Sequence, residues 1–351
     1  MSTALTVPPE AAVEAAVEAA VEAARTPADH LRYRLLTALR SGGFPVEPAV
    51  VRRRIRDGLT AARPIAADIV EVLESAAAPE CDVDLALLAA VPGMAAFGRL
   101  ATGYAYSRVA TRPAHDAEVA RVVTAFIVAS ALFDHACDRE PELVRAMTAT
   151  FPPGWSSDAF HGRVAGRPCA GTPDPVPVKY VAALCGYAAR LWRDLTAAGP
   201  VGSHVHRAAL WSRLVEVHEA QVATAGVAGS RDVRLIWSAP LVVALYAVAL
   251  APGADPVDVG PLLPEAERIG VLLSLVDDLH DLAEDWRWGS ANQYLDGQSV
   301  VTRPGSAAGT PVPWEALLAD EPLDPYLRRI VDLVGSLPAS ERDPLIPWLL
   351  Y

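Results

Sequence analysis

Cysteine is scarce in this sequence. The four cysteines stand far apart, and no two of them form a C-x-x-C pair. They are Cys81, Cys137, Cys169 and Cys185. This spacing argues against a zinc ribbon, a thioredoxin-type redox site and a disulfide scaffold, and it predicts reduced thiols in a cytoplasmic protein. The first residues also lack a positively charged stretch followed by an apolar block, so we expect no signal peptide.

Basic residues are few relative to acidic ones. The chain of 351 residues carries 30 Lys and Arg against 42 Asp and Glu, a formal net charge of −12 at pH 7. We therefore expect no binding of nucleic acid, because the overall field of the protein would repel a polyanion. A phosphate-bearing ligand would need metal ions to invert the charge locally. The hydrophobic fraction of 52% is ample for a large core.

No long apolar run is free of interruption. The segment 235–254 contains no charged residue and has about the length of a bilayer crossing. However, Pro240 and Pro252 interrupt it, and the sequence holds no second such segment. It therefore predicts a buried helix in a bundle, and we expect no stable membrane span.

The alternation of apolar and polar residues that is typical of β-strands is missing from residue 28 onward. Apolar residues recur at helical spacing instead, which predicts an all-α protein. The expected helices are 85–106, 116–137, 179–197, 206–223, 236–250 and 265–288. We expect one all-α domain over 28–351, preceded by an Ala/Glu-rich tail over 1–27. Two Pro- and Gly-rich segments, 152–178 and 296–313, break the pattern and are typical of lids or of surface insertions.

The first of two acidic motifs ends a strongly apolar stretch. Asp134 and Asp138 stand four residues apart on a predicted helix, so both carboxylates leave the same face one turn apart. Residues 126–133 before them are too apolar for a solvated helix surface. Two acids at the end of such a helix are costly unless a cation meets them. Arg139 is an ordinary candidate for that cation.

The second motif is denser. Asp277, Asp281 and Asp285 repeat every four residues, and they drift by only about 80° around a helix over two turns. Asp278 and Glu284 flank this stripe. Like charges at this spacing repel each other, so a helix does not adopt the stripe for stability. Because Mg²⁺ prefers carboxylates combined with substrate phosphates, the two motifs predict a site for Mg²⁺ and a diphosphate.

A solvated acidic face or a di-iron centre accounts for the acidic residues less completely. A solvated face would explain one stripe, but it explains less well two stripes that each follow a long apolar stretch. A carboxylate-bridged di-iron bundle would need Glu-x-x-His on two helices, whereas the sequence offers Asp277-x-x-His280 once. His280 is more simply a polar neighbour of the acids than a ligand.

With both motifs in view, the chain resembles the isoprenoid synthase superfamily, and within it the tetraprenyl-β-curcumene synthase-like family of large terpene synthases. The second motif of that family reads D-x-x-x-D-x-x-E-D-x-x-x-G-x-x-N. The matching residues here are Asp277, Asp281, Glu284, Asp285, Gly289 and Asn292. The first motif of the family ends in D-x-x-C-D-R. It is matched by Asp134, Cys137, Asp138 and Arg139.

The resemblance implies a helical bundle around a central apolar cavity and a class I terpene synthase, which ionises a linear prenyl diphosphate with more than one Mg²⁺. The implied metal ligands are Asp134, Asp138, Asp277, Asp278, Asp281, Glu284, Asp285 and Asn292. The implied catalytic residues are Asp134, Asp138, Asp277, Asp281 and Asp285. The candidates for diphosphate binding are Arg139, Arg231, Arg234 and Arg287. Phe133, Trp237 and Tyr246 are candidates for lining a carbocation pocket, because aromatic faces stabilise cations.

Several alternatives stay open at the level of the sequence. A prenyl transferase, or a head-to-head condensing synthase of the squalene and phytoene type, keeps the fold and changes the reaction. A non-catalytic homologue that binds prenyl chains or a partner protein belongs to a different class. Ala131 leaves room for it, because it stands where the first motif would carry a further acid. A monomer and a homodimer are both compatible with the chain.

Overall fold

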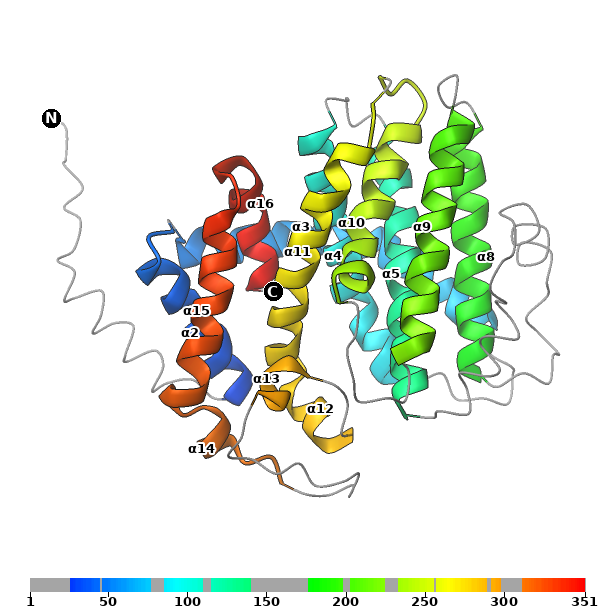
Figure 1. Ribbon diagram of the computed structural model, residues 1–351. Helices are drawn as coiled ribbons and strands as arrows, with labels where there is room; N and C mark the ends of the chain where they lie inside the picture. Colours follow the sequence, from blue (N-terminus) through cyan, green and yellow to red (C-terminus); the bar gives the residue numbers. More distant parts are fainter. Residues whose placement is uncertain are drawn as a thin grey trace, which may run out of the picture. The chain divides into compact units, whose positions relative to one another are not determined.

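The computed structural model (Figure 1) describes residues 26–44, 46–76, 85–109, 115–139, 176–197, 203–224, 233–255, 257–288, 292–297 and 311–350. Every regular element in these ranges is a helix, and none of the described residues lies in a β-strand. The all-α prediction is therefore confirmed. The Ala/Glu-rich tail up to residue 25 and most of the two Pro- and Gly-rich segments lie outside the described residues.

The chain divides into two compact units. The smaller unit contains Met1–Val51, Leu275–Arg342 and residue 350. The larger unit contains Arg52–Ser274, Asp343–Leu349 and residue 351. Helix α11 (Leu263–His280) therefore contributes its first two-thirds to the larger unit and its last residues to the smaller one. The single domain expected over 28–351 stays a prediction.

Five of the helices described in the larger unit pack against one another. They are α4 (Leu85–Arg108), α5 (Asp116–Arg139), α8 (Val176–Thr196), α9 (Ser203–Thr224) and α10 (Val233–Leu250). Figure 1 shows α5 between α4 and α8, and α10 packs against α4, α5 and α9. Helix α3 (Pro48–Ala76) adds Ile65, Ile69 and Leu73 to the same apolar core. The first acidic motif thus lies at the end of a helix that is packed on two sides.

Helix α10 contains most of the uncharged run found in the sequence. Every residue from Ser238 to Ala251 is buried, as expected for a helix that is apolar all round. The helix ends at Leu250, just before Pro252 and Gly253, and Gly253 adopts a φ of 75° that a glycine takes without strain. Within the described ranges, no helix has both the length and the apolar character that crossing a bilayer demands.

Close backbone contacts bring helices of the larger unit together. A Cβ atom on Gly98 of α4 would lie 3.2 Å from Thr124 Cα on α5. A Cβ atom on Gly270 of α11 would lie 2.7 Å from Ser238 N and 3.1 Å from Arg234 O, both on α10. These glycines are needed because any side chain would have to push the neighbouring helix away.

The smaller unit is organised around helices α2 (Pro27–Ser41) and α15 (Asp320–Ser336), which pack against each other. Both helices carry buried aliphatic residues at helical spacing: Leu31, Leu35, Leu39, Leu323, Leu327, Ile330 and Val334. Arg34 on α2 forms ion pairs with Asp320 at 2.8 Å and with Asp324 at 2.6 Å. These contacts join segments that lie at opposite ends of the sequence.

Short helices complete the described part of the chain. They are η1 (Gly260–Leu262), α12 (Leu282–Trp288), α13 (Gln293–Asp296), α14 (Trp314–Leu317) and α16 (Ala339–Leu349). The prediction of one helix over 265–288 is wrong at a single residue, because Asp281 separates α11 from α12. The other five predicted helices are confirmed. Helix α8 begins at Val176, before the predicted start, because Pro177 is tolerated in a first turn.

Candidate functional site

The carboxylate stripe (Asp277, Asp281 and Asp285) crosses the break between α11 and α12. The N–H of Asp281 donates to Asp277 O at 2.8 Å, and the N–H of Asp285 donates to Asp281 O at 2.9 Å. Each four-residue step therefore keeps a helical hydrogen bond, although Asp281 itself lies outside both helices. Asp281 is exposed, and Asp277 and Asp285 are partly exposed. The stripe remains within reach of a ligand from solvent.

Asn292 is the residue that stabilises the break. Its side chain is only 1% exposed, and its Nδ2 donates to the main-chain oxygen of Asp278 and to Asp285 Oδ2, both at 2.7 Å. Its Oδ1 accepts the N–H of Leu295 at 3.0 Å, which caps the start of α13. In an unbroken helix, the Asp278 carbonyl would accept the N–H of residue 282. The amide of Asn292 takes up that carbonyl instead, and repulsion along the stripe also favours the break.

Asp278 belongs to the motif but lies inward. It is 9% exposed, and its Oδ2 accepts hydrogen bonds from Tyr326 OH and from the N–H of Gln293, both at 3.2 Å. Tyr326 OH also lies 3.1 Å from the main-chain oxygen of Leu275. Burial, and then the neighbouring Asp278 carboxylate, raise the pKa of Tyr326 well above its usual range. Asp278 therefore links α11 to α13 and α15.

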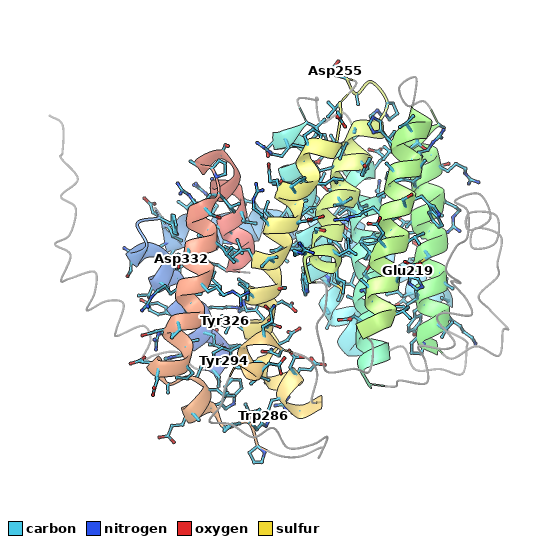
Figure 2. All side chains as sticks on the ribbon, in the orientation of Figure 1. Glu219, Asp255, Trp286, Tyr294, Tyr326 and Asp332 are labelled. Atoms are coloured by element: carbon cyan, nitrogen blue, oxygen red, sulfur yellow. The ribbon has the colours of Figure 1, made fainter. Side chains whose placement is uncertain are left out.

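Two tyrosines from separate elements pack beside this network. Figure 2 shows Tyr294 and Tyr326 near each other, between α15 and the segment that contains α11 and α13. Their rings meet edge to face, with centroids 5.1 Å apart. The hydroxyl of Tyr294 donates to the main-chain oxygen of Leu317 in α14, and burial raises the pKa of Tyr294 to about 12. Both tyrosines are therefore neutral donors at neutral pH.

His280 is uncharged at neutral pH. Burial, and then the guanidinium of Arg32, lower the pKa of His280 to about 4. The expectation that His280 is a polar neighbour of the acids stays a prediction.

The first motif is described only in part. Helix α5 runs without a break to Arg139, so Asp134 and Asp138 lie one helical turn apart as expected. Asp134 is partly exposed, whereas Leu132 and Phe133 beside it are buried. The ring of Phe133 meets that of His218 on α9 edge to face, with centroids 5.5 Å apart. The side chains of Asp138 and Arg139 lie outside the described part of the structure.

The remaining predicted residues are spread over several elements. Arg234 on α10 and Arg287 on α12 are exposed, and Arg231 lies outside the described residues. Tyr246 is buried in α10, and the centroid of its ring lies 6.1 Å from the centroid of the His206 ring. Trp237 is partly buried.

Comparison with protein-family models, curated proteins and solved structures finds no match. The resemblance to the isoprenoid synthase superfamily therefore rests on the motif residues of this sequence.

The predicted metal ligands fit a hard cation unequally. Among the side chains that the structure describes, no group of three or more His, Cys, Asp or Glu is arranged to hold a metal ion. The side-chain oxygen of Asn292 caps helix α13, and the carboxylate of Asp278 accepts a hydrogen bond from the hydroxyl of Tyr326. Asp277, Asp281, Glu284 and Asp285 are partly or fully exposed carboxylates of the kind that Mg²⁺ prefers. The chemistry of these four residues fits Mg²⁺, and a phosphate-bearing ligand would have to complete the coordination.

Sequence reasoning missed two contacts of the motif. Tyr326 lies 48 residues after Asp278, and no local pattern connects the two. The hydrogen bond from the N–H of Gln293 to Asp278 also depends on tertiary structure. In contrast, a signal for the capping role of Asn292 is present, because an Asn that precedes a short helix is a favoured N-cap.

Proposed function

We propose that the protein is a Mg²⁺-dependent class I terpene synthase. It would ionise a linear prenyl diphosphate, release the diphosphate, and let the carbocation cyclise or lose a proton. The observation that supports this most is that the residues of the second motif differ in exposure. Asp281 is exposed, whereas Asp278 and Asn292 are buried and form hydrogen bonds with protein groups. A stripe of like charges above these buried polar residues costs free energy unless a cation binds to it.

The residues of the two motifs would bind and orient the charged end of the substrate. When bound, Mg²⁺ supplies Lewis-acid stabilisation of the leaving diphosphate. Asp277, Asp281, Glu284 and Asp285 are the proposed ligands from the second motif, and the resemblance adds Asp134 and Asp138 from the first. The choice of carboxylates explains how a protein with a net charge of −12 could take a polyanionic ligand.

Arginine side chains would complete the recognition of the diphosphate. Guanidinium groups form paired, charge-assisted hydrogen bonds with phosphate oxygens. Arg234 and Arg287 are exposed and therefore accessible to such a ligand, and Arg139 and Arg231 remain candidates from the sequence. The prenyl chain would be enclosed by apolar and aromatic side chains that exclude water from the carbocation. Phe133, Trp237 and Tyr246 are the proposed aromatic contributors.

The proposal is tested by incubating the full chain with linear prenyl diphosphates of increasing length, with Mg²⁺ or with EDTA. Release of inorganic diphosphate and an extractable cyclic hydrocarbon or alcohol, both dependent on Mg²⁺, are expected. A longer prenyl product would instead support prenyl transfer or head-to-head condensation. Binding without release would support a non-catalytic homologue. If no prenyl diphosphate is bound or turned over, the proposal is wrong.

A further inference from the structure

Both N–H donors and the oxygen of the Asn292 amide have partners among the protein groups. A primary amide offers two N–H donors and one carbonyl oxygen. The acceptors Asp278 O and Asp285 Oδ2 each lie 2.7 Å from Nδ2, and the N–H of Leu295 lies 3.0 Å from Oδ1. The partners themselves fix which atom is nitrogen, because a carbonyl and a carboxylate accept while a main-chain N–H donates. The orientation of the amide follows from its surroundings.

These contacts leave Asn292 poorly suited to metal coordination. A hard cation such as Mg²⁺ would bind the amide through Oδ1, which is the atom that caps α13. The side chain is also only 1% exposed. Oδ1 has a second lone pair besides the one that accepts the N–H of Leu295, but a cation could reach it only if the side chain lost its burial.

The same contacts suit Asn292 to a different task, which is to orient a neighbouring carboxylate. The N–H···O contact with Asp285 Oδ2 is charge-assisted and restricts the rotation of that carboxylate. The second N–H binds the carbonyl of Asp278, whose own carboxylate is bound by Tyr326 and Gln293. Asn292 thus connects the partly exposed acid of α12 to a buried acid of α11 across the break at Asp281.

We propose that Asn292 is a positioning residue that orients Asp285, and that Asn292 and Asp278 form an inner frame rather than part of the metal-ligand set. The carboxylates that remain for the cation in this motif are Asp277, Asp281, Glu284 and Asp285. The inference rests on the proposed function for the presence of a metal. The frame itself rests only on the hydrogen bonds among protein groups.

Two substitutions separate a positioning role from a ligand role. Asn292→Asp keeps an oxygen for the N–H of Leu295, but it removes both N–H donors and places a second charge against Asp285. A metal ligand would tolerate this change, because Mg²⁺ and Mn²⁺ favour carboxylates. Asn292→Ser also keeps a capping oxygen and removes the two donors without adding charge. Asp332→Asn, an exposed position on α15, is the matched control for the folded state.

Manganese binding to the full chain, followed by electron paramagnetic resonance with and without inorganic diphosphate, gives the first readout. We expect Asn292→Asp to raise the Mn²⁺ concentration at half-saturation by about 10- to 100-fold, the usual effect of losing a group that orients a metal ligand. Asn292→Ser should have a smaller effect in the same direction, and Asp332→Asn should have none. Unchanged affinity in Asn292→Asp would show that Asn292 does not orient Asp285 for the metal and would overturn the proposal.

Hydrogen exchange in the metal-free protein gives the second readout, which does not depend on the proposed function. Loss of the frame should speed the exchange of the amides of α12 in Asn292→Ser, while the amides of α2 exchange at their original rate. Equal exchange of α12 in the variant and the unsubstituted protein would overturn the frame. If the unsubstituted protein binds no Mn²⁺, the proposed function fails, and the exchange of α12 still decides whether the frame exists.

Discussion

Helix α11 carries a buried carboxylate near each end, and the two are held by different chemistry. Glu265, in the first turn, forms an ion pair with Arg108 at 2.7 Å and accepts a hydrogen bond from Tyr104 OH. Asp278, in the last turn, accepts hydrogen bonds from two neutral groups, Tyr326 OH and the N–H of Gln293. The first arrangement places an opposite charge against the acid, so that loss of the guanidinium would leave a buried carboxylate without its counter-charge.

The difference extends to the residues around each acid. In the larger unit, Arg213 pairs with Glu267, and Gly270 allows α11 to approach the backbone of α10 closely. Around Asp278, the helix breaks, and the neighbouring Asp277, Asp281 and Asp285 add negative charge. The first part of α11 is therefore built for packing, whereas its last turn supports an acidic surface. Stability measurements on both parts can test this contrast.

The largest effect is expected from Arg108→Ala, which leaves Glu265 buried beside Tyr104. Removing one partner of a buried ion pair should lower the free energy of unfolding by about 3 to 4 kcal/mol, measured by urea denaturation. In a Glu265→Gln background, the same substitution should cost at most about 1 kcal/mol, because no charge is then left behind. Equal costs in both backgrounds would show that the pair does not neutralise Glu265.

The next largest effect concerns acid pH and the smaller unit. Because the pKa of His280 is about 4 in the folded protein and its usual value is 6.5, the unfolded chain binds the proton more readily. Stability should therefore fall as the pH decreases from 6.5 to about 4, by at most roughly 3 kcal/mol, since a tenfold difference in proton affinity is worth about 1.4 kcal/mol. His280→Gln should remove this part of the pH dependence. Denaturation with EDTA present would measure it, and identical curves for both proteins would contradict the burial of His280.

A moderate effect is expected from Gly270→Ala in the first part of α11. The added Cβ would lie 2.7 Å from Ser238 N, and both groups belong to packed helices that have to separate. We expect the free energy of unfolding to fall by about 2 kcal/mol. Gly103→Ala on α4 is the matched control, because nothing lies within 4 Å of its Cβ, and it should raise stability by up to about 1 kcal/mol. If Gly270→Ala behaves like Gly103→Ala in thermal unfolding, the close approach of α10 and α11 is wrong.

The smallest effect is expected from Tyr326→Phe on α15, whose hydroxyl contacts Asp278 in the last turn of α11. The substitution removes one neutral donor from Asp278, while the N–H of Gln293 remains. A loss of about 1 kcal/mol is expected in urea denaturation. A loss as large as that of Arg108→Ala would mean that the two buried acids depend equally on their partners, and the contrast between them would then disappear.

The sequence predicts the local features of this protein well. The periodic apolar residues of α10 and the interrupted run 235–254 are enough to predict a buried helix, because burial on all sides leaves no polar face. The four-residue spacing of Asp277, Asp281 and Asp285 likewise predicts their helical steps, which the main-chain hydrogen bonds confirm.

The sequence fails where a tertiary contact competes with a local rule. The break at Asp281 depends on the amide of Asn292, which reaches back 14 residues to bind the carbonyl of Asp278. Nothing in the helical pattern over 265–288 indicates that this carbonyl has another donor. The inward orientation of Asp278 depends in the same way on Tyr326 in α15. These two contacts determine that Asp278 is buried while Asp281 is exposed. The spacing of the acidic residues alone does not predict this difference.

The central claim is that the exposed acids of the second motif serve a cation that binds diphosphate. The most direct measurement is the Mg²⁺-dependent release of inorganic diphosphate from a prenyl diphosphate by three proteins: the unsubstituted chain, Asp281→Ala and Asp332→Ala. Both Asp281 and Asp332 are exposed, but only Asp281 belongs to the motif. We predict that the unsubstituted chain and Asp332→Ala release diphosphate at the same rate, and that Asp281→Ala releases none while its helical circular dichroism is unchanged. Equal release by Asp281→Ala and the unsubstituted chain would contradict the claim.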